Sequence, residues 1–400
     1  MRKLIFIVCM LMGWSLPAQE TLFAKMFQPK ASSSIPVDYL YLDPPYSRPD
    51  LITAFLNSWA NTNKMVAASN HIVTTVNQTE NRDPFQGAVT LPNGTALLIP
   101  ACSQYFGIVD QNGNYSQGAE NPRNNNYAFW GGVYVSNLNV VVCVPYNTDS
   151  VYLYNVTNGT VSKGASHGYG FNKNAFNGGC LDRYGRVIMA PFRAGSVGIY
   201  DPVQNTWSNG PAAPADHCYS AASVMTNGLV IFTPAGYNNI GIYDPVANTL
   251  INGPLLAGNG WGVDNYQYLG GCNTIDGRIA MAGVGNHSNN RLVLLGPDTN
   301  TVNIVSVTKK SYGGCKLMPD GRILTWGENA TVVNTGAMTY ETGPALTIGT
   351  STAYYPSDAC LLPNGKIVIT QEYISYPLVI YDCLAGRVNT NITLNCFVDR

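Results

Sequence analysis

The chain has 400 residues and a formal net charge of −1, and only 11% of its residues are charged, well below the usual quarter. No basic stripe runs through the sequence, which argues against nucleic acid as a partner. A surface built from Asn, Gly, Ser, Thr and Tyr suits glycans or burial in a larger assembly. It is equally consistent with a plain secreted protein of low surface charge.

The first 18 residues have the pattern of a secretory signal peptide. A basic start, Met1-Arg2-Lys3, is followed by an apolar run from Leu4 to Trp14 and a segment that ends in the small residue Ala18. The apolar run is too short to span a bilayer. We therefore expect cleavage near Ala18 and a mature chain that is exported, to the outside or the cell surface, with no membrane span.

Residues 19–84 do not match the rest of the chain and are predicted to form an N-terminal arm. The stretch Gln28–Arg48 holds prolines and serines and is typical of extended chain. A short helix is predicted to begin at Asp50, because one helical face collects apolar residues, namely Leu51, Ile52, Phe55, Leu56 and Trp59. The arm is expected either to cap one face of the following domain or to attach it to a neighbouring chain.

At the end of the arm, Ile72–Val76 is predicted to be an isolated strand. The C-terminal segment Asn391–Phe397 has its own strand pattern. We therefore expect the following domain to close without help from the arm.

From residue 85 to the C-terminus the chain repeats one pattern seven times. The copies open at Gly87, Gly131, Gly178, Ser220, Gly270, Gly313 and Ser357, with a spacing of about 42 to 50 residues that suits one propeller blade. Within a copy, short runs rich in Val, Ile and Tyr are separated by Asn-Gly or Asp-Gly pairs, which favour hairpin turns. The pattern predicts an all-β, seven-bladed β-propeller with four-stranded antiparallel blades.

The clearest copy carries a family resemblance. It reads Gly178-Gly179-Cys180, then Gly185-Arg186 and Pro191, then Val197 to Pro202, and it ends with Tyr200-Asp-Pro-Val-Gln-Asn-Thr-Trp207. The last segment is similar to the turn between the third and fourth strands of kelch-like repeats. The double glycine precedes the first strand here, whereas kelch repeats place it after the second. The better resemblance is to divergent secreted bacterial or virus-associated repeats, which implies the fold and not a function.

Nine cysteines remain after removal of the signal peptide. Four of them fall on the first strand of a copy, namely Cys180, Cys272, Cys315 and Cys360, while Cys102 and Cys143 share the second strand. Either cysteine is simply the small apolar residue that a tight inner strand needs, or some of these residues pair. The best candidate disulfide is Cys383 with Cys396, in an oxidising compartment.

Eight sequons offer glycosylation sites in a host that has the machinery. They are Asn77, Asn93, Asn114, Asn155, Asn158, Asn286, Asn329 and Asn391.

Aromatic residues recur in the loops that lead into the first strands, around the predicted mouth of the propeller axis. Such rings stack on sugars, or else they pack between adjacent blades. The residues predicted to contact a ligand are Trp130, Trp261, Tyr219 and Tyr266.

The sequence pattern for a catalytic site is weaker than the pattern for a ligand-binding site. His167 and His217 occupy comparable loops and, with Asp216 and Asp264, define a candidate general-base or metal corner. No motif for a cofactor or a metal is present. The repeated Asp201, Asp244 and Asp382 are interpreted as turn residues.

Two functions follow from these patterns. The first is an exported, non-catalytic propeller that acts as a binding or assembly module at a cell surface, in an extracellular matrix, or on a filament or virion. Its partners would be proteins, further copies of itself or glycans, reached through the arm and the propeller faces. The alternative is a secreted polysaccharide lyase or hydrolase with its site at the propeller mouth.

Overall fold

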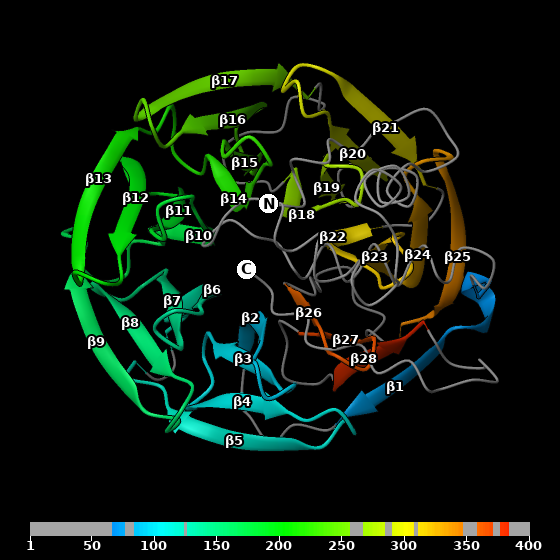
Figure 1. The fold of residues 1–400 in the computed structure, drawn as a ribbon, viewed down its shortest axis with the longest axis horizontal. Helices are drawn as coiled ribbons and strands as arrows, with labels where there is room; N and C mark the ends of the chain where they lie inside the picture. The colour runs from blue at the N-terminus through cyan, green and yellow to red at the C-terminus, as the bar shows by residue number, and fades with distance from the viewer. Residues whose placement is uncertain are drawn as a thin grey trace, which may run out of the picture.

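Seven four-stranded antiparallel sheets surround a central axis, which confirms the predicted seven-bladed β-propeller (Figure 1). The computed structural model describes residues 66–76, 84–123, 126–256, 267–284, 290–307, 311–346, 358–370 and 377–383. In each of the first six blades the chain runs outward from the axis, so the first strand lies innermost and the fourth forms the rim.

The strands of the first four blades are regular and of similar length. Blades one and two contain β2 (Phe85–Thr90), β3 (Ala96–Pro100), β4 (Tyr105–Val109), β5 (Tyr115–Glu120), β6 (Phe129–Val135), β7 (Val140–Pro145), β8 (Ser150–Asn155) and β9 (Val161–Ser166). Blades three and four contain β10 (Phe176–Leu181), β11 (Val187–Pro191), β12 (Ser196–Asp201), β13 (Thr206–Ala212), β14 (Tyr219–Val224), β15 (Val230–Pro234), β16 (Asn239–Asp244) and β17 (Thr249–Leu255).

The remaining three blades complete the ring. Blades five and six contain β18 (Tyr268–Asn273), β19 (Ile279–Gly283), β20 (Arg291–Leu295), β21 (Val302–Ser306), β22 (Ser311–Leu317), β23 (Ile323–Gly327), β24 (Asn329–Asn334) and β25 (Thr339–Ala345). Blade seven contains β26 (Ala359–Leu361), β27 (Lys366–Ile369), β28 (Leu378–Asp382) and β1 (Ile72–Val76), and a 3₁₀ turn at Ala68–Asn70 precedes β1.

The turns within each blade follow the predicted chemistry. The glycine that ends the first hairpin has a positive φ in six blades, for example +78° at Gly185 and +82° at Gly277, a conformation that glycine adopts without steric cost. Asp201 accepts hydrogen bonds from the backbone N–H groups of Val203 and Gln204, and Asp244 does the same one blade later. These aspartates therefore act as turn residues, as predicted.

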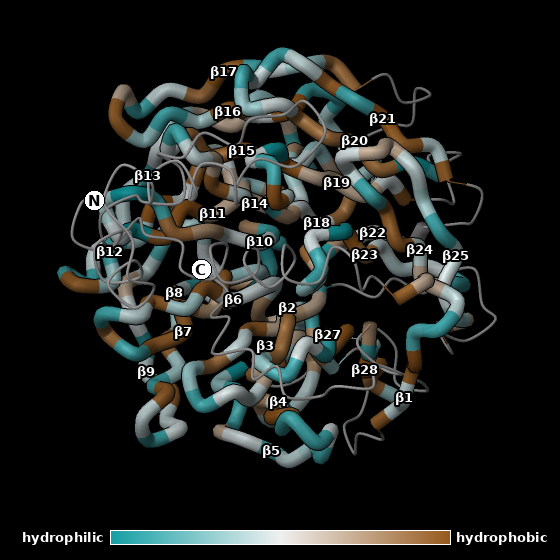
Figure 2. The backbone as a smooth tube through the Cα atoms, turned by 45° about the vertical axis from the view of Figure 1, so that its right-hand side comes forward, coloured by the Kyte–Doolittle hydropathy of each residue, from teal (hydrophilic) through white to brown (hydrophobic). Residues whose placement is uncertain are grey.

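The hydrophobic core is divided among the interfaces between blades. Figure 2 shows apolar segments spread around the whole ring. In the first five blades the first strand opens on a buried aromatic residue that packs on the preceding blade, as Phe129 does against Val89 and Leu97, and Phe176 against Val133 and Val142. Each such ring contributes about 2–3 kcal/mol by leaving water. For these five rings, the interpretation as blade-packing residues is confirmed.

The N-terminal strand closes the ring, and the prediction that Ile72–Val76 is isolated is wrong. Strand β1 pairs antiparallel with β28, in register from Ile72↔Asp382 to Val76↔Leu378, and it forms the rim of blade seven. The pairing removes the exposed edge that β28 would otherwise present. The arm therefore contributes at least β1 to the propeller, whereas its predicted extended stretch and helix, and the strand predicted at Asn391–Phe397, lie outside the described residues.

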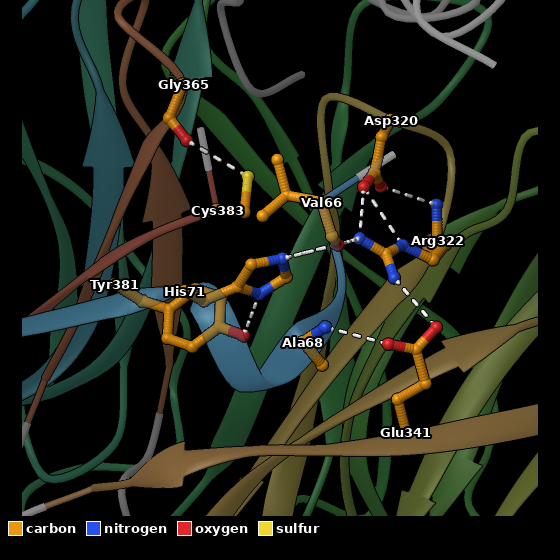
Figure 3. A network of polar contacts seen from close by, with 9 residues as sticks. All are labelled: Val66, Ala68, His71, Asp320, Arg322, Glu341, Gly365, Tyr381 and Cys383. Carbon is orange, nitrogen blue, oxygen red and sulfur yellow. Dashed lines mark hydrogen bonds and ion pairs between the residues drawn. The ribbon is translucent and has the colours of Figure 1, made fainter. Parts of the chain in front are cut away.

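A polar network fixes the segment that leads into β1 (Figure 3). Arg322 of blade six donates to the carbonyl of Val66 at 2.8 Å, and the Ala68 N–H donates to Glu341 at 2.7 Å. In other blades, the arginine that follows the hairpin glycine contacts the next blade. Arg186 of blade three donates to the carbonyl of Pro245 in blade four, and Arg278 of blade five donates to that of Thr335 in blade six. The N-terminal segment thus replaces the turn that blade seven would have supplied.

Candidate functional site

Small residues on the inner strands shape the centre of the propeller. Each of the first five blades has one extra, unpaired residue near the start of its first strand, at Gln86, within 130–131, within 177–178, at Ser220 and at Gly270. A methyl group built on Gly87 would lie 2.7 Å from the Cα of Gly131, and one on Gly270 would lie 3.0 Å from the Cα of Gly314. The repeated glycines therefore let neighbouring backbones approach one another closely around the axis.

A cavity of about 380 Å³ lies within this ring. Inner-strand residues from blades one to six line it, together with the loops around Tyr127, Tyr146, Asn147 and Asn174 at one end. These loops either lead into a first strand or follow a second strand. Because the first and second strands of a blade are antiparallel, the start of one and the end of the other lie on the same face of the propeller. The cavity therefore opens at the face where the sequence predicts the ligand site.

Gln86 is the cavity residue that most clearly suggests a ligand. Its side chain is 1% exposed and lines the cavity, yet neither its amide nitrogen nor its amide oxygen has a hydrogen-bond partner among the described residues. Leaving a buried amide unpaired costs about 1–3 kcal/mol for each group. By contrast, the hydroxyl of Ser220, at the same place in blade four, donates to the carbonyl of Tyr268 at 2.8 Å. Gln86 thus combines a place in the cavity wall with an amide that has no partner among the described residues.

Trp130 is the predicted ligand contact that the structure places in the cavity wall. It is half-buried, and its ring centroid lies 4.8 Å from that of Tyr146, which in turn stacks on Phe192 at 6.1 Å. Packing on Tyr146 and Phe192 holds the indole at the mouth. Trp130 follows Phe129 directly, so it occupies in blade two the place that Gln86 occupies in blade one.

The other three predicted contacts are not placed in the cavity wall. Tyr219 is fully buried, packs on Phe232 with 5.2 Å between ring centroids, and does not line the cavity. Burial raises the pKa of the Tyr219 hydroxyl. Its position gives Tyr219 a packing role between blades. Trp261 and Tyr266 lie outside the described residues.

The structure does not bring the two predicted histidines together. His167 is buried beside Phe176 and Trp207, and its Nε2 lies 2.7 Å from the carbonyl oxygen of Thr148. Burial lowers the pKa of His167, because desolvation disfavours the charged ring. These contacts place His167 between blades two and three.

His217 lies one blade further on and contacts a different set of residues. Its Nε2 accepts a hydrogen bond from Nε of Arg193 at 2.6 Å, its Nδ1 is 3.1 Å from a carboxylate oxygen of Asp216, and its ring meets Phe192 edge-on. Its backbone has a φ of +53°. The partner Asp264 of the predicted catalytic corner lies outside the described residues.

The predicted disulfide and glycosylation sites are placed only in part. Cys383 is buried at the end of blade seven, whereas Cys396 lies outside the described residues, so their pairing stays a prediction. The sequon residues Asn93, Asn114 and Asn158 are exposed, and Asn155 and Asn329 are partly buried. Asn77, Asn286 and Asn391 lie outside the described residues.

Several cavity residues were missed from the sequence. They are Gln86, Tyr127, Tyr146, Asn147, Asn174, Trp326 and Asp358. Aligning the copies one residue at a time would have found Gln86, because it shares a column with Trp130.

Within the described residues, no helix is both long and apolar enough to cross a membrane. Nor do three or more His, Cys, Asp or Glu side chains gather there as a metal site would require.

The fold has many relatives among solved structures, although the sequence matches no protein-family model and no curated protein. Streptogramin B lyase aligns with a TM-score of 0.65 at 13% identity, over 79% of this chain and 99% of the lyase. A catalytically inactive virginiamycin B lyase from Staphylococcus aureus with quinupristin gives 0.63 at 11% identity, over 78% and 99%.

A third structural relative has a different setting. The extracellular domain of a one-component system from B. thetaiotaomicron aligns with a TM-score of 0.59 at 11% identity, over 78% of this chain and 40% of that one. At such low identities these likenesses show the propeller fold alone. The kelch-like resemblance stays a prediction.

Proposed function

We propose that the chain is an exported, non-catalytic binding module whose axial cavity holds an uncharged ligand rich in hydroxyl or amide groups, with a glycan unit as the preferred class. Gln86 carries the proposal. Its buried amide, unpaired among the described residues, would hydrogen-bond to a ligand in a cavity of about 380 Å³, a size within the usual range for small-molecule sites.

The composition of the wall supports a sugar-like ligand. Trp130 and Tyr146 supply aromatic surface at the mouth, and Asn147 and Asn174 add two further amide side chains to the wall. Asp358 is the one charged residue among those that line the cavity within the described chain. A neutral ring with hydroxyl groups matches an aromatic face beside uncharged donors and acceptors better than an anion or a long apolar chain would.

The location and partners are part of the same proposal. The apolar run after Met1-Arg2-Lys3 supports export, and the low charge of the chain supports a role at a surface or in an assembly. Protein partners, or further copies of this chain, would meet the propeller faces or the part of the arm before residue 66.

A polysaccharide lyase or hydrolase is the weaker proposal. It depended on a corner formed by His167 and His217, and the contacts of these two rings share no residue. His217 is 8% exposed, and its Nε2 is already occupied by Arg193. A general base must reach its substrate proton directly or through one water, and a ring engaged in this way is badly placed to do so.

A glycan array on the purified mature chain, followed by calorimetric titration of the glycans that bind, tests the binding proposal. We expect Gln86→Leu and Trp130→Ala each to weaken binding about five- to thirtyfold, since each removes an interaction worth roughly 1–2 kcal/mol. Tyr184→Ala is the control, because Tyr184 is 53% exposed in a hairpin turn and does not line the cavity.

Two results would overturn the proposal. One is a parent protein that binds no glycan on the array. The other is a pair of correctly folded cavity variants whose affinities equal that of the parent.

A further inference from the structure

Facing places on adjacent first strands follow a simple rule. We count places along each first strand from its opening aromatic residue, so that Gly179 is the third place after Phe176 and Cys180 is the fourth. Successive side chains of a strand point to opposite sides. The third place of a first strand therefore points toward the preceding blade and the fourth place toward the following blade. As a result, the fourth place of one blade faces the third place of the next blade.

Two interfaces show this pairing directly. The side chain of Val133, at the fourth place of blade two, lies 3.4 Å from a methyl group built on Gly179 of blade three. The hydroxyl oxygen of Ser223, at the fourth place of blade four, lies 3.3 Å from a methyl group built on Gly271 of blade five.

At the interface of blades five and six, both facing places are cysteine. Cys272 is at the fourth place after Tyr268 in blade five, and Cys315 is at the third place after Tyr312 in blade six. Their sulfur atoms are 3.4 Å apart. The other first-strand cysteines meet smaller partners. Cys180, at the fourth place of blade three, packs in one cluster with Ala222, and Cys360 of blade seven packs in one cluster with Ala88. Among the described first strands, this interface alone places two cysteines face to face.

We infer that Cys272 and Cys315 are an oxidation site that forms a disulfide between blades five and six when the protein meets a small organic disulfide. The two sulfur atoms must close from 3.4 Å to about 2.0 Å. Cys272 lies on one inner strand and Cys315 on its neighbour, and these strands pack directly against each other, so only a small shift of the side chains is needed.

The reaction proceeds by two thiol–disulfide exchanges. The Cys272 thiolate attacks one sulfur of the small disulfide, which forms a mixed disulfide and releases one small thiolate. The Cys315 thiolate then attacks the Cys272 sulfur, which closes the protein disulfide and releases the second small thiolate. The two cysteine protons end on the two released thiols, and the two electrons lost by the protein reduce the small disulfide.

The order of the two steps follows from exposure. Cys272 is partly exposed, whereas Cys315 is 5% exposed and lines the axial cavity. Contact with Cys272, and then burial, raise the pKa of the Cys315 thiol well above its usual value. Cys315 is therefore the poorer first nucleophile and the natural resolving thiol.

The test uses the purified mature chain, incubated with oxidised glutathione at about pH 8.5, then unfolded, alkylated and digested without reduction. We expect a cross-linked peptide pair that contains Cys272 and Cys315, and an intact mass lower by two hydrogen atoms after the pair has formed. Reduction before alkylation should return both peptides as separate alkylated species.

Variants separate this pairing from general oxidation. Cys272→Ser should fold normally, because Ser223 holds the same place in blade four. This variant should form no cross-link, and its Cys315 should carry either glutathione or the alkyl label. Cys180→Ser, the same change in blade three, should leave the cross-link intact. Alkylation of both Cys272 and Cys315 in the oxidised parent, or a cross-link from either residue to another cysteine, would overturn the inference.

Discussion

His71 and Tyr381 join two parts of the chain that lie 310 residues apart, at the point where the ring closes. Nε2 of His71 lies 3.1 Å from the carbonyl oxygen of Val66, which can only accept, so in the neutral ring Nε2 carries the proton and Nδ1 accepts from the Tyr381 hydroxyl. In blades three and four the corresponding tyrosines donate to the turn asparagines Asn205 and Asn248. His71 therefore substitutes, from the N-terminal segment, for an asparagine that blade seven would have carried in its own turn.

The closure should weaken in mild acid through His71. Burial, with a further contribution from the charge of Arg322, lowers the pKa of His71 from its usual value near 6.5. A ring whose folded pKa is lowered stabilises the fold above pH 6.5, and that stability is lost as the pH falls through the folded pKa. Protonation would also remove the acceptor that Tyr381 uses.

Urea unfolding measured between pH 7.5 and pH 5 checks this dependence. We expect the free energy of unfolding to fall with decreasing pH, by at most about 1.4 kcal/mol per pH unit for one histidine. His71→Asn, which copies the residue type of the other blades, should flatten the slope but not remove it, because the pKa of His167 is also lowered by burial. An unchanged slope in His71→Asn would show that His71 does not carry the effect.

Removal of the Arg322 side chain should be much more harmful than loss of a surface ion pair. Arg322 and Asp320 are 3% and 1% exposed and lie 2.7 Å apart, and Arg322 also holds Val66. Arg322→Ala leaves a buried carboxylate without its charge partner, which costs about 3–5 kcal/mol. Lys163→Ala, which breaks the more exposed pair with Asp149, should cost less than about 1 kcal/mol. Chemical denaturation of both variants measures the difference, and equal losses would contradict this account.

Local features of the fold were readable from the sequence, and long-range ones were not. The positive φ at Gly185 and the turn role of Asp201 depend on neighbours within a few residues, so the repeat predicted both. The pairing of β1 with β28 depends on a partner some three hundred residues away, which no local pattern contains. The strand itself was predicted, but its place in the ring was not.

At the candidate site, the sequence did not show which of two adjacent residues on a first strand lines the cavity. Trp130 and Tyr219 were predicted together as aromatics at the mouth, yet Tyr219 aligns with Phe129 and Trp130 with Gln86. Adjacent residues on a strand point to opposite sides. One column therefore packs between blades, whereas Gln86, Trp130, Ser220 and Leu269 of the other column line the cavity and Asn177 does not. Gln86 was missed because an amide has no hydrophobic signature.

Deletion of β1 should destabilise the ring and promote association. A chain that begins at residue 66 keeps the strand and the contacts of Val66, Ala68 and His71, whereas a chain that begins at residue 78 loses all of them. The second chain exposes the edge of β28 and the apolar cluster on which Val73 packs. We expect it to unfold at a clearly lower temperature and to form concentration-dependent aggregates, as followed by light scattering. Identical melting of the two truncated chains would rule out closure by β1.

Gly314→Ala should disturb both the fold and the cavity. Gly314 has a φ of +83°, and a methyl group built there collides with the ring of Trp326, which is 1% exposed and also lines the cavity. Gly185 has a similar φ of +78° but no heavy atom within 4 Å of such a methyl group. Gly185→Ala therefore measures the backbone cost alone, about 1–2 kcal/mol, and Gly314→Ala should add a further 1–3 kcal/mol of overpacking.

Substitution of Trp326 separates the two terms at Gly314. In a Trp326→Leu background the collision is gone, so Gly314→Ala should cost only about as much as Gly185→Ala. The coupling between the two sites, measured by a double-mutant cycle in urea, should then be about 1–3 kcal/mol. If the effects of Gly314→Ala and Trp326→Leu on the free energy of unfolding simply add, the Trp326 ring moves aside without cost. The inner strands would then be packed less tightly around the axis than the close approach of Gly270 to Gly314 indicates.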